Sequence, residues 1–177
     1  MKILLIIDTQ KYKYHNELYV DFESALVNYF DRHGDNSLIV FDMSVDDSEH
    51  EKFSYIKNLC ADLIITLDCA GFDMLTTGNT LSYNNLPCRM AHVLTKNDSE
   101  FNRYLEYRQN FSMVTYYPED ENMGLRQGKY PWITNVQEMK KLVYKNISEK
   151  DHSENIAKIE LWLSKMLKDL KYEDIDT

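Results

Sequence analysis

The chain has 177 residues and a formal net charge of −9, from 29 acidic against 20 basic residues. Binding along a nucleic-acid backbone requires a basic surface, which so acidic a chain does not favour, so no nucleic-acid partner is expected. With 44% hydrophobic and 28% charged residues, the composition is that of a globular chain, and its length predicts a single domain over residues 1–177.

Apolar runs alternate with helical patterns along the chain, which is typical of an α/β fold with a mainly parallel sheet. Lys2–Asp8 is the first run, rich in Ile and Leu and ended by an acid. Residues with helical spacing follow and predict an amphipathic helix that Gly34 ends. Its apolar face holds Phe22, Ala25, Leu26, Tyr29 and Phe30. Four more strands are predicted: Ser37–Phe41, Leu63–Leu67, Arg89–Leu94 and Ser112–Tyr116.

Two pairs of residues have the spacing of a capping box, in which the side chain at the start of a helix and one three residues later bond each other's backbone. Ser48 and Glu51 predict a helix that carries Phe53, Ile56, Leu59 and Cys60 inward. Asn135 and Glu138 predict a second helix, which Val136, Met139, Leu142, Val143 and Ile147 make amphipathic. A further helix is expected after Asp98 or Ser99.

These elements predict a three-layer, Rossmann-like domain of the flavodoxin-like kind, with a mainly parallel five-stranded sheet and a long C-terminal helix. Residues 1–118 form the core βα units, 119–133 an irregular loop and 134–171 the C-terminal helices. Residues 153–171 are amphipathic at near-heptad spacing. This last helix is therefore expected either to pack on the sheet or to pair with a second subunit or another protein.

The three cysteines, Cys60, Cys69 and Cys88, have no paired spacing, which argues against a disulfide framework and predicts a reducing, cytoplasmic setting. The first apolar run is too short for a signal sequence or a membrane span. No later stretch approaches 18 consecutive apolar residues. The sequence therefore predicts a soluble protein with no membrane partner.

Three of the predicted strands end in an aspartate: Asp8, Asp42 and Asp68. If the strand order is 2-1-3-4-5, the first and third strands are neighbours, and Asp8 and Asp68 come close together with Asp42 beside them. Such carboxylates suit a Mg²⁺ ion, a phosphate ester or a proton-transfer step, with Asp8 and Asp68 as catalytic and metal-binding residues. The alternative is that these acids only end strands and cap helices, for which Asp is a common choice.

Further candidate ligand-binding residues lie in the middle of the chain. Cys69 follows Asp68 and would act as a nucleophile only with a base nearby, for which His92 is the candidate. The 79–89 loop offers uncharged donors and acceptors that suit a sugar or nucleoside, namely Asn79, Ser82, Tyr83, Asn84 and Asn85. Arg126 and Lys129 could close over an anionic ligand.

Several chemistries lose support because their motifs are absent. The sequence has neither G-x-x-x-x-G-K-[ST] nor G-x-G-x-x-G, so no glycine-rich loop cradles a pyrophosphate in the familiar way. It has no H-E-x-x-H and no close pair of histidines, which argues against zinc. It also has no G-x-S-x-G elbow, which argues against an α/β-hydrolase.

The opening LLIIDTQ resembles that of isochorismatase-type cysteine hydrolases. The resemblance implies that Asp8 belongs to a catalytic triad. That family also has a lysine after a middle strand, for which Lys96 is the candidate, and a Cys–Val pair that this sequence lacks.

Three segments, KILLIID, DLIITLDCAGFDML and VLTK, resemble strands of response-regulator receiver domains. The resemblance implies Asp68 as phospho-acceptor, Asp8 as a metal-binding acid and Thr95 as the switch hydroxyl. The chain departs from that family where its fifth strand ends in YYPEDEN instead of a Lys–Pro pair.

The leading functional hypothesis is a binding domain for a small molecule, a nucleotide or a nucleotide sugar, without an assigned reaction. One alternative is a carboxylate- or Mg²⁺-assisted hydrolase or transferase, including half of a GT-B-type glycosyltransferase on the analogy of architecture alone. The other alternative is a protein-interaction module without catalysis, which would use residues 153–171.

Overall fold

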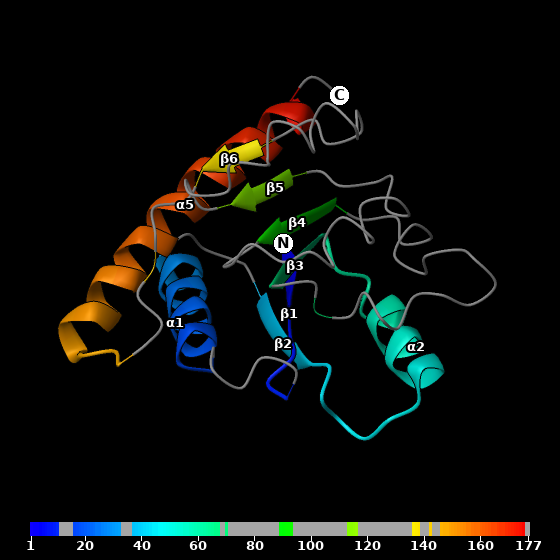
Figure 1. The fold of residues 1–177 in the computed structure, drawn as a ribbon. Helices are drawn as coiled ribbons and strands as arrows, with labels where there is room; N and C mark the ends of the chain where they lie inside the picture. The colour runs from blue at the N-terminus through cyan, green and yellow to red at the C-terminus, as the bar shows by residue number, and fades with distance from the viewer. Residues whose placement is uncertain are drawn as a thin grey trace.

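In a computed structural model of the chain, the described residues are 1–10, 16–32, 37–67, 70, 89–93, 113–116, 136–138, 142 and 146–175. They form an α/β fold with a parallel sheet (Figure 1). The strands are β1 (Lys2–Ile7), β2 (Ser37–Asp42), β3 (Leu63–Leu67), β4 (Arg89–Val93), β5 (Met113–Tyr116) and β6 (Val136–Glu138). The helices are α1 (Asn16–Arg32), α2 (Glu49–Leu59) and α5 (Glu149–Ile175).

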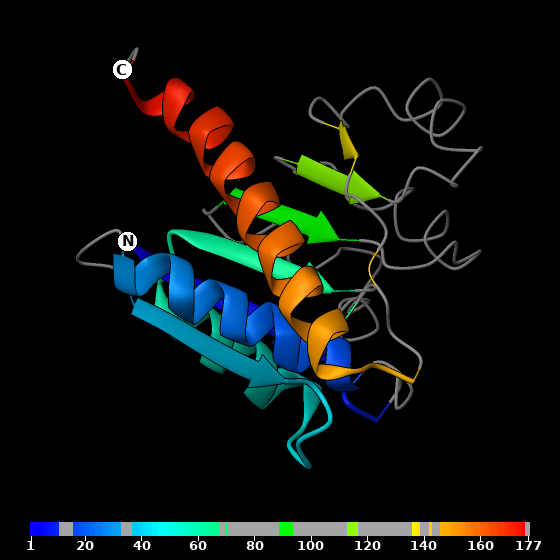
Figure 2. The same cartoon turned by 90° about the vertical axis from the view of Figure 1, so that its left-hand side faces the viewer.

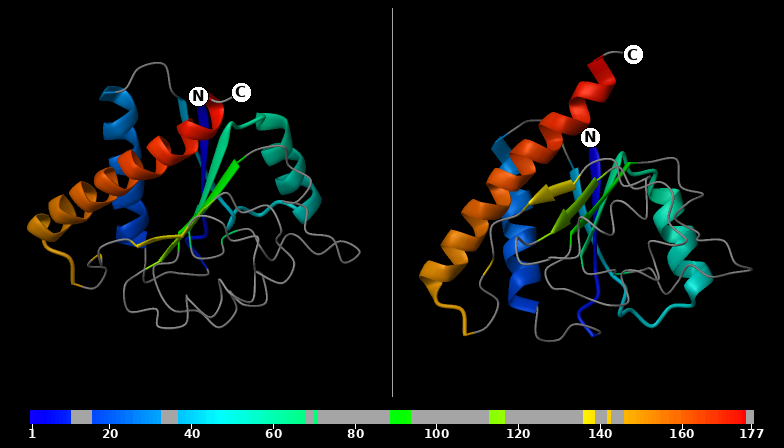
Figure 3. Two further views of the ribbon diagram at one scale, coloured as in Figure 1. Left: turned by 90° about the horizontal axis from the view of Figure 1, so that it is seen from above. Right: turned by 45° about the horizontal axis from the view of Figure 1, so that its top comes forward.

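The strands lie in the order β2-β1-β3-β4-β5-β6, and each neighbouring pair is parallel. Helices α1 and α5 cover one face of the sheet, and α2 lies on the other (Figures 1 and 3). Turned by 90°, the molecule shows α1 alongside β2 and the longer α5 crossing the same face (Figure 2). A parallel sheet needs cover on both faces, because crossover connections carry the chain over the sheet between strands.

Strand β1 lies at the centre of the core. Its residues Ile3, Leu4, Leu5 and Ile6 have no exposed surface, which agrees with the unbroken apolar run in the sequence. Alternate side chains point to opposite faces, and Ile3 and Leu5 join the cluster formed with α1 and α5. The predicted apolar face of α1 is confirmed, because Phe22, Ala25, Leu26 and Phe30 are buried in this cluster and Tyr29 packs against it.

Among the described residues the sheet has six strands, one more than the five predicted from the sequence. Strand β6 occupies residues 136–138, where the Asn135–Glu138 spacing predicted the start of a helix, so that prediction is wrong. The reason is a long-range contact. Val136 pairs with Val114, so β6 satisfies backbone groups of β5 that would otherwise lie at the open edge of the sheet. The predicted helix after Asp98, the end at Gly34 and the 119–133 loop lie outside the described residues.

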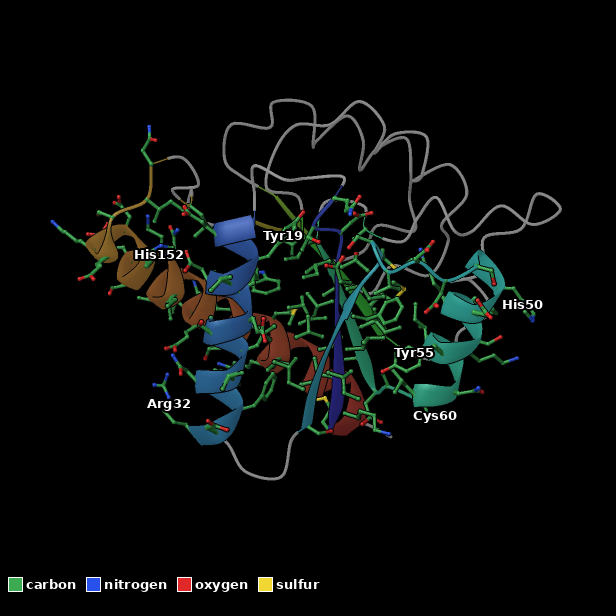
Figure 4. All side chains as sticks on the ribbon, turned by 90° about the horizontal axis from the view of Figure 1, so that it is seen from below. Tyr19, Arg32, His50, Tyr55, Cys60 and His152 are labelled. Carbon is green, nitrogen blue, oxygen red and sulfur yellow. The ribbon has the colours of Figure 1, made fainter. Side chains whose placement is uncertain are left out.

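Helix α2 begins as predicted and ends differently. Ser48 Oγ accepts a hydrogen bond from Glu51 N at 3.2 Å, and Ser48 N donates to Glu51 Oε2 at 2.9 Å, which completes the capping box. Ile56 is buried, but Cys60 is exposed and forms the C-cap with a φ of 49°. The prediction that Cys60 points inward is therefore wrong, because the helix stops before it and the backbone turns into the left-handed region (Figure 4).

The C-terminal helix packs on its own domain. In α5, the residues buried in the common cluster are Ile159, Trp162, Leu163, Met166 and Leu167, and Ile156 packs against them. Trp162 meets Phe22 of α1 edge-on, with 6.2 Å between ring centroids. Within the described ranges, no helix has an apolar stretch long enough to cross a bilayer.

Shortening Leu163 tests this packing. Leu163→Ala should lower the free energy of unfolding by about 2–5 kcal/mol, because the fully buried side chain leaves a cavity between α5 and the sheet. Leu161→Ala on the same helix is the control, since Leu161 is 48% exposed and its loss should change stability by about 0.5 kcal/mol or less. Urea unfolding curves measure both. Equal effects of the two substitutions would contradict the burial of this helix face.

Cys60 offers a test of the left-handed cap. Cys60→Gly should raise the free energy of unfolding by about 0.5–1 kcal/mol, because glycine adopts this conformation without the steric cost of a Cβ atom. Cys60→Ala keeps that cost and removes only the thiol, so it should be near neutral. Thermal unfolding of the three proteins under reducing conditions decides between these outcomes.

Candidate functional site

The first three strands end at one edge of the sheet. β1 pairs with β2 on one side and with β3 on the other, all parallel, so their carboxyl ends point the same way. Asp42 is the last residue of β2, Asp8 directly follows β1, and Asp68 follows β3 in the sequence. The predicted arrangement of three neighbouring parallel strands is therefore confirmed, although Asp68 itself lies outside the described residues.

Asp42 bonds the segment after β1 to the segment after β2. Its Oδ2 accepts a hydrogen bond from the Thr9 hydroxyl at 2.5 Å, and its Oδ1 accepts one from Thr9 N at 3.2 Å. Oδ1 also accepts Ser44 N at 3.0 Å, an Asx-type turn two residues on. The Thr9 and Ser44 hydroxyl oxygens lie 3.1 Å apart. We call this group of Thr9, Asp42 and Ser44 the strand-end clamp.

The clamp stands where the β1–β2 ladder stops. Met43 N still donates to Ile7 O at 2.8 Å, the last backbone bond between these two segments. One step further, Thr9 N donates to the Asp42 carboxylate, and the ammonium group of Lys52 donates to Met43 O at 2.7 Å. Side chains therefore satisfy the backbone groups that the ladder would otherwise have paired, and the two strands can diverge.

These hydrogen bonds control the charge of Asp42. Partial burial raises the pKa of its carboxyl, but the Thr9 hydroxyl, the Ser44 and Thr9 backbone N–H groups and the Ser44 hydroxyl together lower the pKa below the ordinary 3.8. Hydrogen bonds to a carboxylate favour its ionised form. Asp42 thus stays charged at neutral pH, with both oxygens already bonded within the protein.

Asp8 lies at the same edge and is half buried. Its Oδ1 accepts a hydrogen bond from Gln10 N at 3.2 Å, which forms a second Asx-type turn. Asp8 and Asp42 thus both bond to backbone groups where their strands end, as expected if these acids serve to end strands. The predicted catalytic and metal-binding roles of Asp8 remain predictions.

The other predicted site residues fall outside the residues that the structure describes. They are Asp68, Cys69, Asn79, Ser82, Tyr83, Asn84, Asn85, Arg126 and Lys129, together with Lys96 and Thr95 from the two family comparisons. The backbone of His92 belongs to β4, where it pairs with Thr66 of β3. The described residues contain no group of three or more His, Cys, Asp or Glu side chains that could hold a metal ion.

A second polar group, which sequence reasoning missed, joins α1 to α5. Asp21 is only 2% exposed, and its Oδ1 lies 2.6 Å from Nδ1 of His152. The fully buried Asn155 donates from Nδ2 to Asp21 Oδ2 at 3.0 Å. Both side-chain oxygens of Asp21 thus have a hydrogen-bond partner, which burial of a polar group requires. His152 and Asn155 stand three residues apart on one helix face, but nothing in the sequence indicates their partner, which lies 131 positions from His152 and 134 from Asn155.

The apolar face of residues 153–171, which the sequence offered to a partner, is occupied. Where the structure describes it, this face packs against α1 and the sheet of its own chain. An interaction module that used this face would first have to open the core.

No protein-family model matches the chain, and no curated protein matches its sequence. The resemblances to cysteine hydrolases and to receiver domains therefore receive no support from these comparisons. Any functional argument has to come from the geometry of the sheet edge.

The strand-end clamp has a testable pH dependence. Asp42→Asn should cost about 1–2 kcal/mol of unfolding free energy at neutral pH, because the amide weakens charge-assisted hydrogen bonds to Thr9 and Ser44. Since the folded-state pKa of Asp42 is lowered, its contribution is present above the unfolded pKa near 3.8 and is lost as the pH falls through the lower folded pKa. The difference from the unsubstituted protein should therefore shrink below about pH 4.

Asp47→Asn is the matched control, since it makes the same change of charge at an exposed position of the loop after β2. Denaturant unfolding over a pH series measures both variants. A constant difference between Asp42→Asn and the unsubstituted protein from neutral to acid pH would contradict the clamp.

Proposed function

We propose that the chain is a Rossmann-like domain of the flavodoxin-like kind that binds a small polar molecule, of the nucleotide or nucleotide-sugar class, at the carboxyl edge between β1 and β3. One observation carries the proposal. From β1 the chain passes over one face through α1 to β2, and from β2 it passes over the other face through α2 to β3 (Figure 3). The strand order therefore reverses between β1 and β3: the strand after β1 lies on one side of them, and the strands after β3 lie on the other.

Such a reversal is the switch point at which open parallel sheets bind their ligands. Because β2 follows β1 on one side and β4 follows β3 on the other, neither strand has its successor across the edge between them. Backbone N–H groups and strand-ending side chains then border a crevice that is lined from both sides. The strand order supports a ligand between β1 and β3 in preference to any other part of this edge.

The chemistry of the edge favours a hydroxylated ligand. β1 and β3 pair in a register that joins Ile6 to Thr66, and the same offset in sequence separates Asp8 from Asp68. Two carboxylates at this point suit the hydroxyl groups of a ribose or a sugar, or a Mg²⁺ ion bound with a phosphate. The uncharged polar residues between 79 and 85 add to this preference, and the missing glycine-rich motifs argue only against a glycine-rich loop as the group that holds the phosphates.

Asp42 has a supporting role in this proposal. Because its oxygens are bonded to Thr9 and Ser44, we assign it the positioning of the segment after β1, not contact with the ligand. Asp8 remains the ligand-binding residue from that segment. A reducing, cytoplasmic location is part of the proposal and agrees with the free, exposed thiol of Cys60.

A thermal-shift panel tests the site. With Mg²⁺ present, nucleotides and nucleotide sugars are added singly, and a true ligand at about 100 times its Kd should raise the Tm by about 5–10 °C. Asp8→Asn and Asp68→Asn should each abolish the shift while leaving the unliganded fold intact. Asp46→Asn, an exposed acid after β2, should retain it.

Two outcomes would contradict the site. In the first, no compound in the panel raises the Tm of the unsubstituted protein. In the second, a shift occurs but survives both Asp8→Asn and Asp68→Asn. A rise in Tm of these variants without ligand would mean that the acids only repelled each other in the folded state.

A further inference from the structure

Strand β2 forms one margin of the sheet, with β1 as its strand neighbour (Figure 2). Ser37 N donates to Met1 O and Met43 N to Ile7 O, so the odd-numbered residues of this strand point their backbone groups toward β1. By the alternation of a strand, Leu38 and Val40 point their N–H and C=O groups to the outside. Within the described ranges, the sheet continues no further on that side.

Strand β2 itself, which the structure describes in full, has no lysine, no proline and no bulge. Strands at sheet edges commonly carry lysine, proline or a bulge that prevents another strand from adding to them. In β2 the sequence is SLIVFD, with four consecutive apolar residues and its only charge at the last position. All four apolar residues are partly exposed. A regular, apolar and unprotected edge is a template for a further strand.

Exposed apolar side chains gather on the elements that flank this edge. Among the described residues, six large hydrophobic side chains are exposed, and four of them belong to α1, to α2 or to the loop after β2. On the α2 side, the ring of Tyr55 stacks on Phe41 of β2 at 5.0 Å while remaining 45% exposed (Figure 4). Val45, in the loop that follows β2, is another of these four residues and is 39% exposed.

On the other face, α1 packs beside β2 and carries two exposed residues, Val20 and Val27. They stand seven residues apart on α1 and so lie on one side of the helix, with Val20 57% exposed. Asp21 and Arg32 mark the side of α1 that faces α5, because they bond to His152 and Glu160. The helical positions of Val20 and Val27 lie away from that side. We call the surface formed by Val20, Val27, β2, Val45 and Tyr55 the β2 edge surface.

We propose that the β2 edge surface binds a second copy of this chain, with the two β2 strands antiparallel about a two-fold axis. The outward N–H and C=O groups of an edge strand are best satisfied by another open edge, and each copy supplies one of identical length. A stable interface buries about 1,200–2,000 Å² in total, more than one strand pair provides. The apolar residues on both flanks supply the additional area.

The residue pattern of β2 is compatible with itself in this direction. With the axis at Ile39, Leu38 stands opposite the partner's Val40, and both use their outward backbone groups. Ser37 then faces the partner's Phe41, so no two charges oppose each other within the paired residues. The antiparallel arrangement also separates the two acidic loops that hold Asp46 and Asp47, which a parallel pair would place side by side. This interface is independent of the proposed ligand site.

The mass of the full chain in solution gives the first test. Light scattering during size-exclusion chromatography over a concentration series should show twice the 21.0 kDa of one chain. The double substitution Val20→Glu and Val27→Glu changes only exposed positions, and it should raise the Kd of the dimer by at least about tenfold because it places carboxylates in an apolar interface. Leu161→Glu, an equally exposed apolar position on α5, should leave the dimer unchanged.

Hydrogen exchange at single amides gives the second test and does not depend on a substitution. The amides of Leu38 and Val40 should exchange more slowly as the protein concentration rises, while those of Ile39 and Phe41, which face β1, should not change. A monomer at every concentration would overturn the proposal, as would equal loss of the dimer in Leu161→Glu. Larger open assemblies would overturn the two-fold arrangement, and so would exchange at Leu38 and Val40 that is independent of concentration.

Discussion

The complete burial of β1 is the constraint on which the rest of this structure depends. A strand without exposed surface between Ile3 and Ile6 must have a strand on each side and helices on both faces. Its neighbours β2 and β3 satisfy the backbone groups, and α1 with α5 on one face and α2 on the other remove the side chains from water (Figure 1). Because β2 lies on one side of β1 and β3 with its successors on the other, this arrangement also creates the switch point at which we propose a ligand.

The acids at the ends of these strands have different environments despite their similar positions in sequence. Asp42 is bonded to Thr9 and Ser44 and closes the ladder between β1 and β2. Asp8 makes a local turn with Gln10 and remains half buried at the same edge. A carboxylate whose oxygens already have backbone and hydroxyl donors is held in place and is poorly suited to exchange them for a ligand. In the proposal, Asp42 therefore positions the segment after β1, and the strand order places the ligand on the β1–β3 side of the edge.

The helix layer on the α1 side combines apolar packing with one buried polar contact. Asp21, held by His152 and Asn155, gives the α1–α5 pair a specific alignment that apolar side chains alone would not impose, since its oxygens have partners in one arrangement only. With α5 committed to the core, the molecule presents two other margins for interaction. The carboxyl ends of the central strands serve the proposed ligand, and the outer side of β2 serves the proposed second copy.

The sequence by itself determined the element types where local signals and burial agree. Strand β3 has the bounds that its apolar run predicted, Ser48 and Glu51 form the predicted capping box, and the apolar face of α1 is buried as its spacing required. Each of these depends on residues close together in the chain. Only the tertiary structure decided that Val136–Glu138 joins the sheet, that Cys60 turns outward, that Asp42 serves Thr9 and that Asp21 meets His152. Those outcomes depend on which strand edges and polar groups come together after folding. Residues that meet over such long distances in the chain have no fixed spacing, so the sequence pattern does not indicate them.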